Sequence, residues 1–290
     1  MPGLQALNRR IKSVKSTRKV TRAMQMVSAS KMRRAQNQAI TSRGYASLAW
    51  ELISELNQNI VIEHPLLSEN ERATKVGIIL ISTNKGLVGS LNSNLLGKIR
   101  EIEKADIEIV KEFVVMGKKM REATSRLRKN VVADFEKKES RTVPEDVYPI
   151  AQMISSQYQK GEYKRVYVVY SEFVSTLTQR PMAKVLLPIK AEGINKIRPD
   201  GERSDFLFEP DAYSVLNHLL PRILESQIYQ AVLESDASEH SARMIMMKNA
   251  TESAGDLISD LTLTFNQLRQ NKITTELSEI TAGKLALENK

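Results

Sequence analysis

The chain has 290 residues, enough for one large domain or two modest ones, and 41% of them are hydrophobic. Lysine and arginine outnumber aspartate and glutamate 43 to 34, so the net charge is +9 and acidic partners are expected. The lack of cysteine excludes disulfides, thiol catalysis and cysteine-ligated metals. No apolar run is long enough to cross a bilayer, and the first residues do not have the pattern of a signal peptide.

A long helix is predicted at the start of the chain. No proline occurs between Pro2 and Pro65, and Gly44 is the only glycine in this stretch after Gly3. Residues spaced alternately three and four positions apart from Leu4 form a stripe along one face of a helix. The stripe is apolar at its ends and polar in its middle, and the side chains of its lower half are small. The pattern predicts one helix of about 54 residues, roughly 80 Å long. Such a helix needs a partner helix along most of its length.

The middle of the chain changes to short apolar runs rich in β-branched residues. Four runs are typical of buried strands: Lys75–Thr83, Phe113–Gly117, Lys164–Ser171 and Met182–Ile189. Helical patterns lie between them, at Leu91–Lys104, Lys118–Arg128 and Pro144–Gln159. The alternation predicts an α/β domain with a mostly parallel sheet at residues 75–190, between linkers at 58–74 and 191–210.

A second long helix is predicted at the end of the chain, from about Asp211 to Leu287. Pro221 is a candidate kink near its beginning, and no proline follows. If this helix pairs antiparallel with the first, its partner ends near Phe265, and roughly 30 Å of single helix continues beyond that point. Because an isolated helix is poorly stable in water, this end needs an external socket. The fold class is therefore α+β, with a coiled coil formed by residues 1–57 and 211–290.

Candidate catalytic chemistry is sparse. Ser82–Leu96 reads as a strand, a glycine-containing turn and a helix, but Lys85, Gly86 and Gly89 match neither phosphate-binding glycine motif, so a tight connection is favoured. The three histidines are far apart and lack metal-ligand spacing. We expect no catalytic residues, no metal and no cofactor.

The first fifty residues contain eleven lysines and arginines and no acidic residue, more than a merely solvated helix face usually carries. A nucleic acid is one possible partner, although no aromatic residue lies between Leu4 and Tyr45 to stack on bases. A membrane surface is a second, but the charges are scattered around the helix. An acidic protein socket, where long flexible cations make weak and interchangeable contacts, is the third. A basic coiled-coil nucleic-acid-binding protein and a nucleotide-using enzyme remain the alternatives.

Four segments carry a close resemblance to the gamma subunit family of F-type ATP synthases: Val20–Gln36, Ser82–Asn92, Glu209–Thr251 and Ile273–Gly283. The resemblance implies a central-stalk rotor that couples ion flow to ATP synthesis, with a coiled coil inside a ring of three alpha and three beta subunits and a Rossmann-like domain at its foot. It also implies contacts with an epsilon subunit and a membrane c-ring, a peripheral location on the cytoplasmic face of a bacterial cell membrane, no membrane insertion and no nucleic acid.

The resemblance further implies roles for individual residues. Contacts with beta-subunit catch loops fall on Arg269, Gln270, Thr274 and Lys85. Contacts with the acidic lever of the beta subunits fall on Arg9, Arg10, Lys12, Lys15, Arg18, Lys19, Arg22 and Met24, and Met24 is expected near Arg243. The tip in an apolar sleeve would be Ile273, Leu277, Ile280 and Leu287, and the foot on the membrane ring would be Phe206, Phe208 and Glu209. Val88 stands where many members have cysteine, and the cysteine-bearing insert of chloroplast members is absent.

Overall fold

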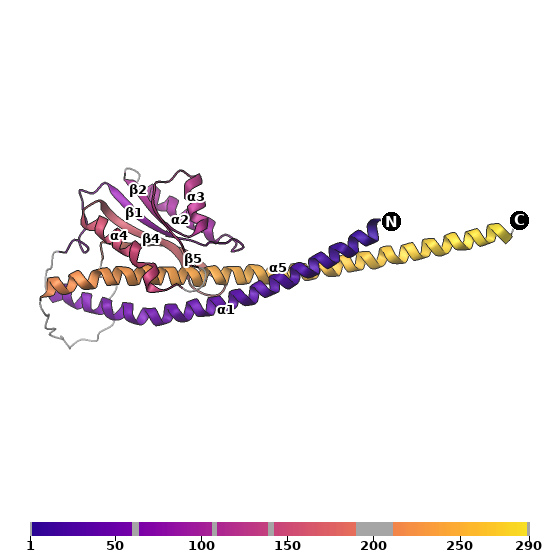
Figure 1. The fold of residues 1–290 in the computed structure, drawn as a ribbon, viewed down its shortest axis with the longest axis horizontal. Coiled ribbons are helices and arrows are strands. Elements are labelled where there is room, and N and C mark those ends of the chain that lie inside the picture. Colours follow the sequence, from indigo (N-terminus) through magenta and orange to yellow (C-terminus); the bar gives the residue numbers. More distant parts are fainter. Residues whose placement is uncertain (1, 60–63, 106–108, 139–141, 190–210, 289–290) are drawn as a thin grey trace. The chain divides into compact units, whose positions relative to one another are not determined.

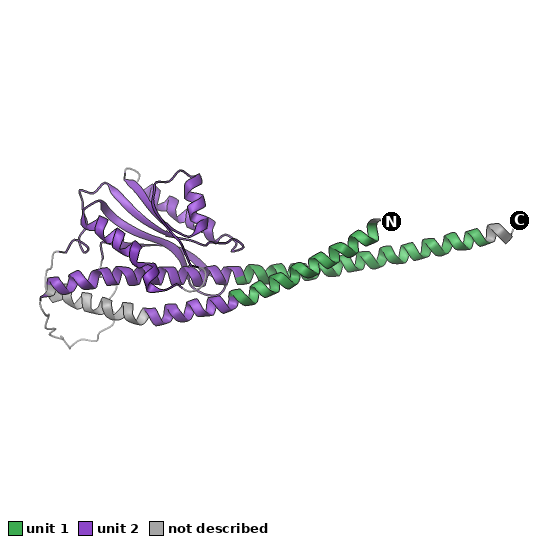
Figure 2. Cartoon of the chain, in the orientation of Figure 1, with its two compact units in different colours: residues 1–28, 244–290 green, residues 29–243 purple. Residues whose placement is uncertain are grey.

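A computed structural model describes residues 2–59, 64–105, 109–138, 142–189 and 211–288. Figure 1 shows its elements, which are α1 (Pro2–Asn59), β1 (Lys75–Ile81), α2 (Leu91–Ala105), β2 (Val110–Met116), α3 (Lys118–Arg126), β3 (Val131–Phe135), η1 (Pro144–Asp146), α4 (Tyr148–Gln159), β4 (Tyr163–Phe173), β5 (Gln179–Leu187) and α5 (Ala212–Glu288). The chain divides into two compact units, coloured separately in Figure 2. Unit 1 is Met1–Ser28 with Met244–Lys290, and unit 2 is Ala29–Arg243.

The two long terminal helices are confirmed. Helix α1 has 58 residues, and α5 has 77 and continues through Pro221. Each helix contributes residues to both units, so the boundary between the units does not coincide with a helix end. The expected division into a coiled coil, an inserted domain and linkers stays a prediction, and the second expected linker lies outside the described residues.

Unit 2 contains a five-stranded sheet in the order β3-β2-β1-β4-β5. Strands β1, β2, β3 and β4 are parallel, and β5 pairs antiparallel with β4. The mostly parallel α/β sheet expected from the sequence is therefore confirmed. Because the chain leaves β1 toward β2 and returns on its other side at β4, the carboxyl ends of β1 and β4 form the topological switch point.

The two faces of the sheet build two separate apolar cores, because neighbouring strand residues point to opposite faces. Ile79 and Ile81 face a core completed by α4 and by the part of α5 that includes Leu220 and Leu224. Val76, Ile78 and Leu80 face a core completed by α2 and α3. The α5 helix thus forms part of the main core of unit 2.

Two elements of the middle region differ from the expectation. Strand β3 was not predicted, because Val131–Phe135 is short, contains Asp134 and lies at an edge with much of its surface exposed. The helix expected over Pro144–Gln159 is instead a 3-10 turn followed by α4.

In the described part of the chain, no helix is both long and apolar enough to span a membrane.

Candidate functional site

The paired segments of α1 and α5 in unit 1 are held at close distance by small side chains. The hydroxyl oxygens of Thr21 and Thr251 lie 2.8 Å apart. A methyl group added at Gly255 would lie 3.5 Å from the guanidinium carbon of Arg18. Ala254 is 8% exposed, so a small side chain is buried beside this contact, and the larger Met247 is buried one turn away. This polar, small-residue contact is the middle of the stripe that the sequence predicted.

The stripe itself is confirmed over the part of α1 whose side chains are described. In unit 1 Ile11 and Ser28 are buried, and in unit 2 so are Met32, Ala35 and Ala39. The buried part of the stripe therefore combines large apolar side chains, Ile11 and Met32, with the small ones of Ser28, Ala35 and Ala39.

The cations expected to meet the acidic lever form an exposed surface on α1, which we call the basic surface: Arg9, Arg10, Lys12, Lys15, Arg18, Lys19 and Arg22. None of the seven forms an ion pair within the described part of the chain. Met24 is half-buried and belongs to the same helix segment. The structure thus places these eight residues together on one stretch of α1, and the seven cations among them are exposed.

The C-terminal part of α5 becomes progressively more exposed. Among the residues of α5 whose side chains are described, Phe265 is the last hydrophobic one that is half-buried. Beyond it, Ile273 is 48% exposed, Leu277 59% and Ile280 70%. These three follow one another at four and three residues, so they lie on one helix face, which we call the apolar tip. Leu287 also lies on α5, but its side chain is outside the described residues.

The expected catch residues Arg269, Gln270 and Thr274 lie on the same exposed stretch of α5. The Thr274 hydroxyl donates a hydrogen bond to the backbone oxygen of Gln270, 3.0 Å away, and so is bound within its own helix. The structure therefore brings these residues together with the apolar tip. The expected foot residues Phe206, Phe208 and Glu209 lie outside the described residues.

Lys85, the fourth expected catch residue, lies in unit 2 in the loop between β1 and α2, and it is exposed. This loop is tight: Leu87 and Gly89 have φ angles of 63° and 60°. Arg243 of α5 donates hydrogen bonds to the backbone oxygens of Lys85 and Gly86, at 3.4 and 3.3 Å. The loop is thereby attached to α5. Met24 belongs to unit 1 and Arg243 to unit 2, and the expected proximity of these two residues stays a prediction.

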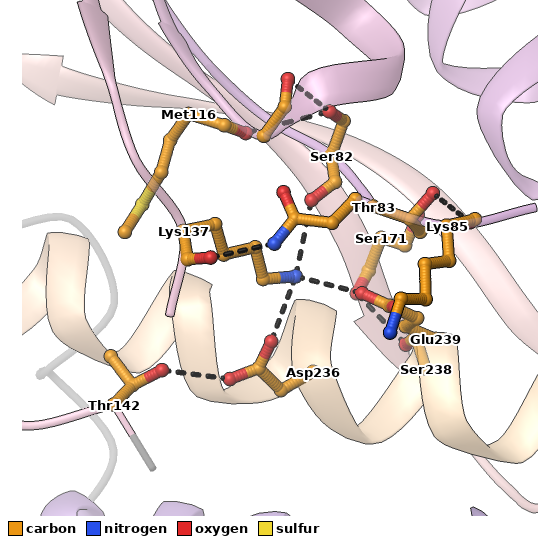
Figure 3. A network of polar contacts seen from close by, with 12 residues as sticks. Ser82, Thr83, Lys85, Met116, Lys137, Thr142, Ser171, Asp236, Ser238 and Glu239 are labelled. Carbon is orange, nitrogen blue, oxygen red and sulfur yellow. Dashed lines mark hydrogen bonds and ion pairs between the residues drawn. The ribbon is translucent and has the colours of Figure 1, made fainter. Parts of the chain in front are cut away.

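A buried charge cluster in unit 2 was missed by the sequence reasoning. It consists of Lys137 after β3 and of Asp236, Glu239 and Arg243 on α5, and we call it the Lys137 cluster (Figure 3). Burial alone would lower the pKa of Lys137, but the carboxylates of Asp236 and Glu239 outweigh it and raise that pKa. Burial alone would raise the pKa of Glu239, but the nearby positive charges of Lys137 and Arg243 outweigh it and lower that pKa. Lys137 and Glu239 are therefore both charged at neutral pH.

One sequence signal could have indicated this cluster. Asp236, Glu239 and Arg243 recur at three and four residues, so they share one face of a helix that is otherwise small or apolar there. His240 lies beside them, and burial lowers its pKa to about 4 despite the nearby carboxylates. Among the described residues, no group of three histidines or carboxylates could hold a metal ion.

Comparison with known proteins gives the family. A family model described as ATP synthase matches residues 3–287. The chain is 42% identical to the ATP synthase gamma chain of Roseiflexus castenholzii, with 99% of both chains covered. It is 41% identical to the ATP synthase gamma chain of Xanthomonas oryzae, with 99% of this chain and 100% of the relative covered.

A solved structure shares the fold. A chain in the cryo-EM structure of the Euglena gracilis mitochondrial ATP synthase, OSCP/F1/c-ring, superimposes with a TM-score of 0.68. That match covers 98% of this chain and 94% of the other at 16% sequence identity. With the relatives matching from end to end, the chain belongs to the ATP synthase gamma chain family and is a central-stalk rotor subunit.

Proposed function

We propose that the chain rotates inside a ring of three alpha and three beta subunits and so couples transmembrane ion flow to ATP synthesis. Family membership supports the complex, and the exposed apolar tip of α5 is the observation that supports the geometry. An apolar face on a helix without a neighbour is stable only when another surface covers it. In this proposal Ile273, Leu277, Ile280 and Leu287 lie in an apolar sleeve formed by the ring.

The basic surface of α1 supports a weak electrostatic contact with the ring. Its seven cations are exposed and form no ion pair within the described residues. An exposed ion pair contributes about 0–1 kcal/mol, so it can break and re-form as the stalk turns. Together with Met24, these residues would meet acidic segments of the beta subunits, and Arg269, Gln270, Thr274 and Lys85 would meet beta-subunit loops.

The remaining partners are an epsilon subunit and a membrane c-ring. Phe206, Phe208 and Glu209 would contact the c-ring, and the chain would lie peripherally on the cytoplasmic face of a bacterial membrane without entering it. The Euglena neighbour, which belongs to an assembly titled with F1 and the c-ring, supports a c-ring among the partners. The chain would supply asymmetry to the nucleotide sites of the ring and have no catalytic site of its own.

Affinity purification from native membranes tests this function. A tagged copy of the chain should bring down alpha and beta subunits in a ratio of three each to one stalk, together with ATPase activity. Recovery of nucleic acid without these subunits would contradict the proposal and favour a basic nucleic-acid-binding protein, whose binding would weaken steeply with added salt.

Charge removal tests the role of the basic surface. Replacing Arg9, Arg10, Lys12, Lys15, Arg18, Lys19 and Arg22 by glutamine should reduce ATP-driven proton pumping more than assembly. The control is Arg100→Gln with Lys104→Gln, two exposed cations of α2 in unit 2, which should change neither quantity. Pumping and synthesis at the wild-type level in the first variant would show that these charges have no mechanical role.

A further inference from the structure

The Lys137 cluster satisfies every polar atom of its lysine and of its two carboxylates. The Lys137 ammonium lies 2.7 Å from Asp236 Oδ1 and 3.0 Å from Glu239 Oε2, and it donates to the backbone oxygen of Ser82 at 3.1 Å. An ammonium has three donors, so all are used. The second oxygen of Asp236 accepts from Thr142 at 3.0 Å. The second oxygen of Glu239 accepts from Arg243 at 2.9 Å.

The cluster lies at the place where a doubly wound sheet normally binds a ligand. Ser82 directly follows β1, and Ser171 belongs to β4, so both mark the switch point at the carboxyl ends of these strands. Figure 3 shows the Lys137 ammonium between Ser82 and the two α5 carboxylates. The Ser238 hydroxyl of α5 donates to the backbone oxygen of Ser171 at 2.9 Å. The helix itself therefore occupies the positions that a bound ligand would take.

The cluster has no net charge and is shielded from solvent. The side chain of Lys137 is 2% exposed, that of Glu239 9% and that of Arg243 10%. Two positive and two negative groups cancel one another, so the cluster adds no net charge to the core. Buried pairs are screened little by salt, and networks with all partners satisfied are stiff and specific in geometry. A surface ion pair of similar length would have neither property.

We propose that the Lys137 cluster is a mechanical latch: it fixes α5 to the carboxyl ends of β1 and β3 and passes torque between the sheet and the helix. Lys137, Asp236 and Glu239 act as positioning residues for coupling. The apolar contacts between α5 and the sheet are not directional, whereas the charged hydrogen bonds of the cluster have a defined geometry and so add to fixing the rotation and the axial position of the helix. This role rests on the proposed rotor function.

Three variants separate a latch from a merely stabilising contact. Lys137→Met leaves the buried carboxylate of Glu239 and the half-buried one of Asp236 with one counter-charge, and the melting temperature of the full chain should fall by about 10 °C. Lys137→Met with Asp236→Asn removes one charge of each sign and keeps the pair of Glu239 with Arg243, so stability should return. Lys138→Met is the control, because Lys138 is 57% exposed and pairs with Asp146 at 2.6 Å. It should change nothing.

The deciding measurement is the ratio of ATP synthesis to ATP hydrolysis in vesicles that contain the assembled enzyme. The double variant should regain thermal stability and still lose most of the coupled synthesis, while Lys138→Met keeps both. If coupling returns together with stability, the cluster is only structural and the proposal is wrong. If the wild-type chain itself gives no coupled synthesis, the rotor function fails instead.

Amide hydrogen exchange on the full chain tests the latch without the enzyme assay. Lys137→Met should increase exchange at residues 82–86 and 236–243 and leave β2 and α4 unchanged. Unchanged exchange at those two segments, or an increase spread over the whole sheet, would overturn the proposal. This measurement also decides the case in which the double variant fails to regain its stability.

Discussion

The hydroxyl oxygens of Thr21 and Thr251 lie 2.8 Å apart, although 230 positions separate the two residues in the sequence. The Thr21 hydroxyl donates to the Arg18 oxygen of its own helix at 3.1 Å, and the single proton of the Thr251 hydroxyl is shared between the Thr21 hydroxyl and the Met247 oxygen at 2.7 Å. The contact therefore joins two helices without breaking the helical hydrogen bonds of either. In unit 1 it lies beside the small residues Ala254 and Gly255 and is directional, so it should help to fix the register of the pair.

Replacing Thr251 by valine keeps the shape of the side chain and removes this contact. We expect the free energy of unfolding to fall by about 1 kcal/mol, the usual contribution of one hydrogen bond. Urea unfolding of the full chain measures it. Thr262→Val is the control, because the exposed Thr262 hydroxyl bonds only to its own helix, at the Ile258 oxygen. An equal loss in both variants would mean that the helix-to-helix contact contributes nothing.

Truncating the chain after Asn271 removes the apolar tip. Because the removed side chains are about half exposed or more, the stability of the isolated chain should change by less than about 0.5 kcal/mol. In the assembled enzyme the same truncation should reduce torque, since the sleeve contact is lost. Single-molecule rotation gives the torque and urea unfolding the stability. Full torque in the truncated rotor would contradict the assignment of the tip.

A glycine at the end of β2 is required by a close backbone contact. Gly117 has a φ of 109°, and a Cβ added there would lie 2.6 Å from the backbone oxygen of Ser82. Gly117→Ala should therefore cost on the order of 3 kcal/mol, because both the conformation and the space are unfavourable. Gly97→Ala is the matched control within helix α2, where nothing lies within 4 Å, and it should stabilise by up to about 1 kcal/mol.

His240 should make the stability depend on pH. Burial lowers its pKa to about 4, whereas an unfolded histidine has a pKa near 6.5. Between these values the unfolded chain binds more protons than the folded chain. The stability that the neutral His240 contributes is therefore fully present above about pH 6.5 and is lost as the pH falls toward 4. The loss would reach at most about 3 kcal/mol.

Urea unfolding at pH 7 and pH 5 measures this effect. His240→Gln should flatten the difference in stability between the two pH values. His218→Gln is the control, because His218 is exposed on the same helix, and it should leave the difference unchanged. If both variants keep the pH dependence of the unsubstituted chain, the proton is taken up elsewhere.

The spacing of apolar residues predicted the helices and strands whose structure depends mainly on residues close together in the sequence. The steps of three and four that link Ile11, Met32 and Ala39 are visible along the sequence, and all three side chains are buried. Strand β3 was missed because its five residues are half exposed at an edge and depend on pairing with β2. The apolar tip was predictable because the unequal lengths of α1 and α5 follow from where prolines are absent.

The Lys137 cluster could not be predicted in the same way. Lys137 adjoins a second lysine, and nothing in the local pattern separates the buried one from Lys138, which is exposed. The difference arises only when α5 crosses the strand ends, which brings residues about a hundred positions apart together. Such contacts depend on tertiary packing, whereas a helical stripe depends on spacing within one segment.

Unit 1 is assembled from the first 28 residues and the last 47 of the chain. On the ribosome, the first of these segments is synthesised more than two hundred residues before its partner. During that interval Ile11 has no helix to cover it, and the strong positive charge of the segment keeps it hydrated and separate from other copies. The sheet core can form meanwhile, and the pairing of the two ends comes last in synthesis.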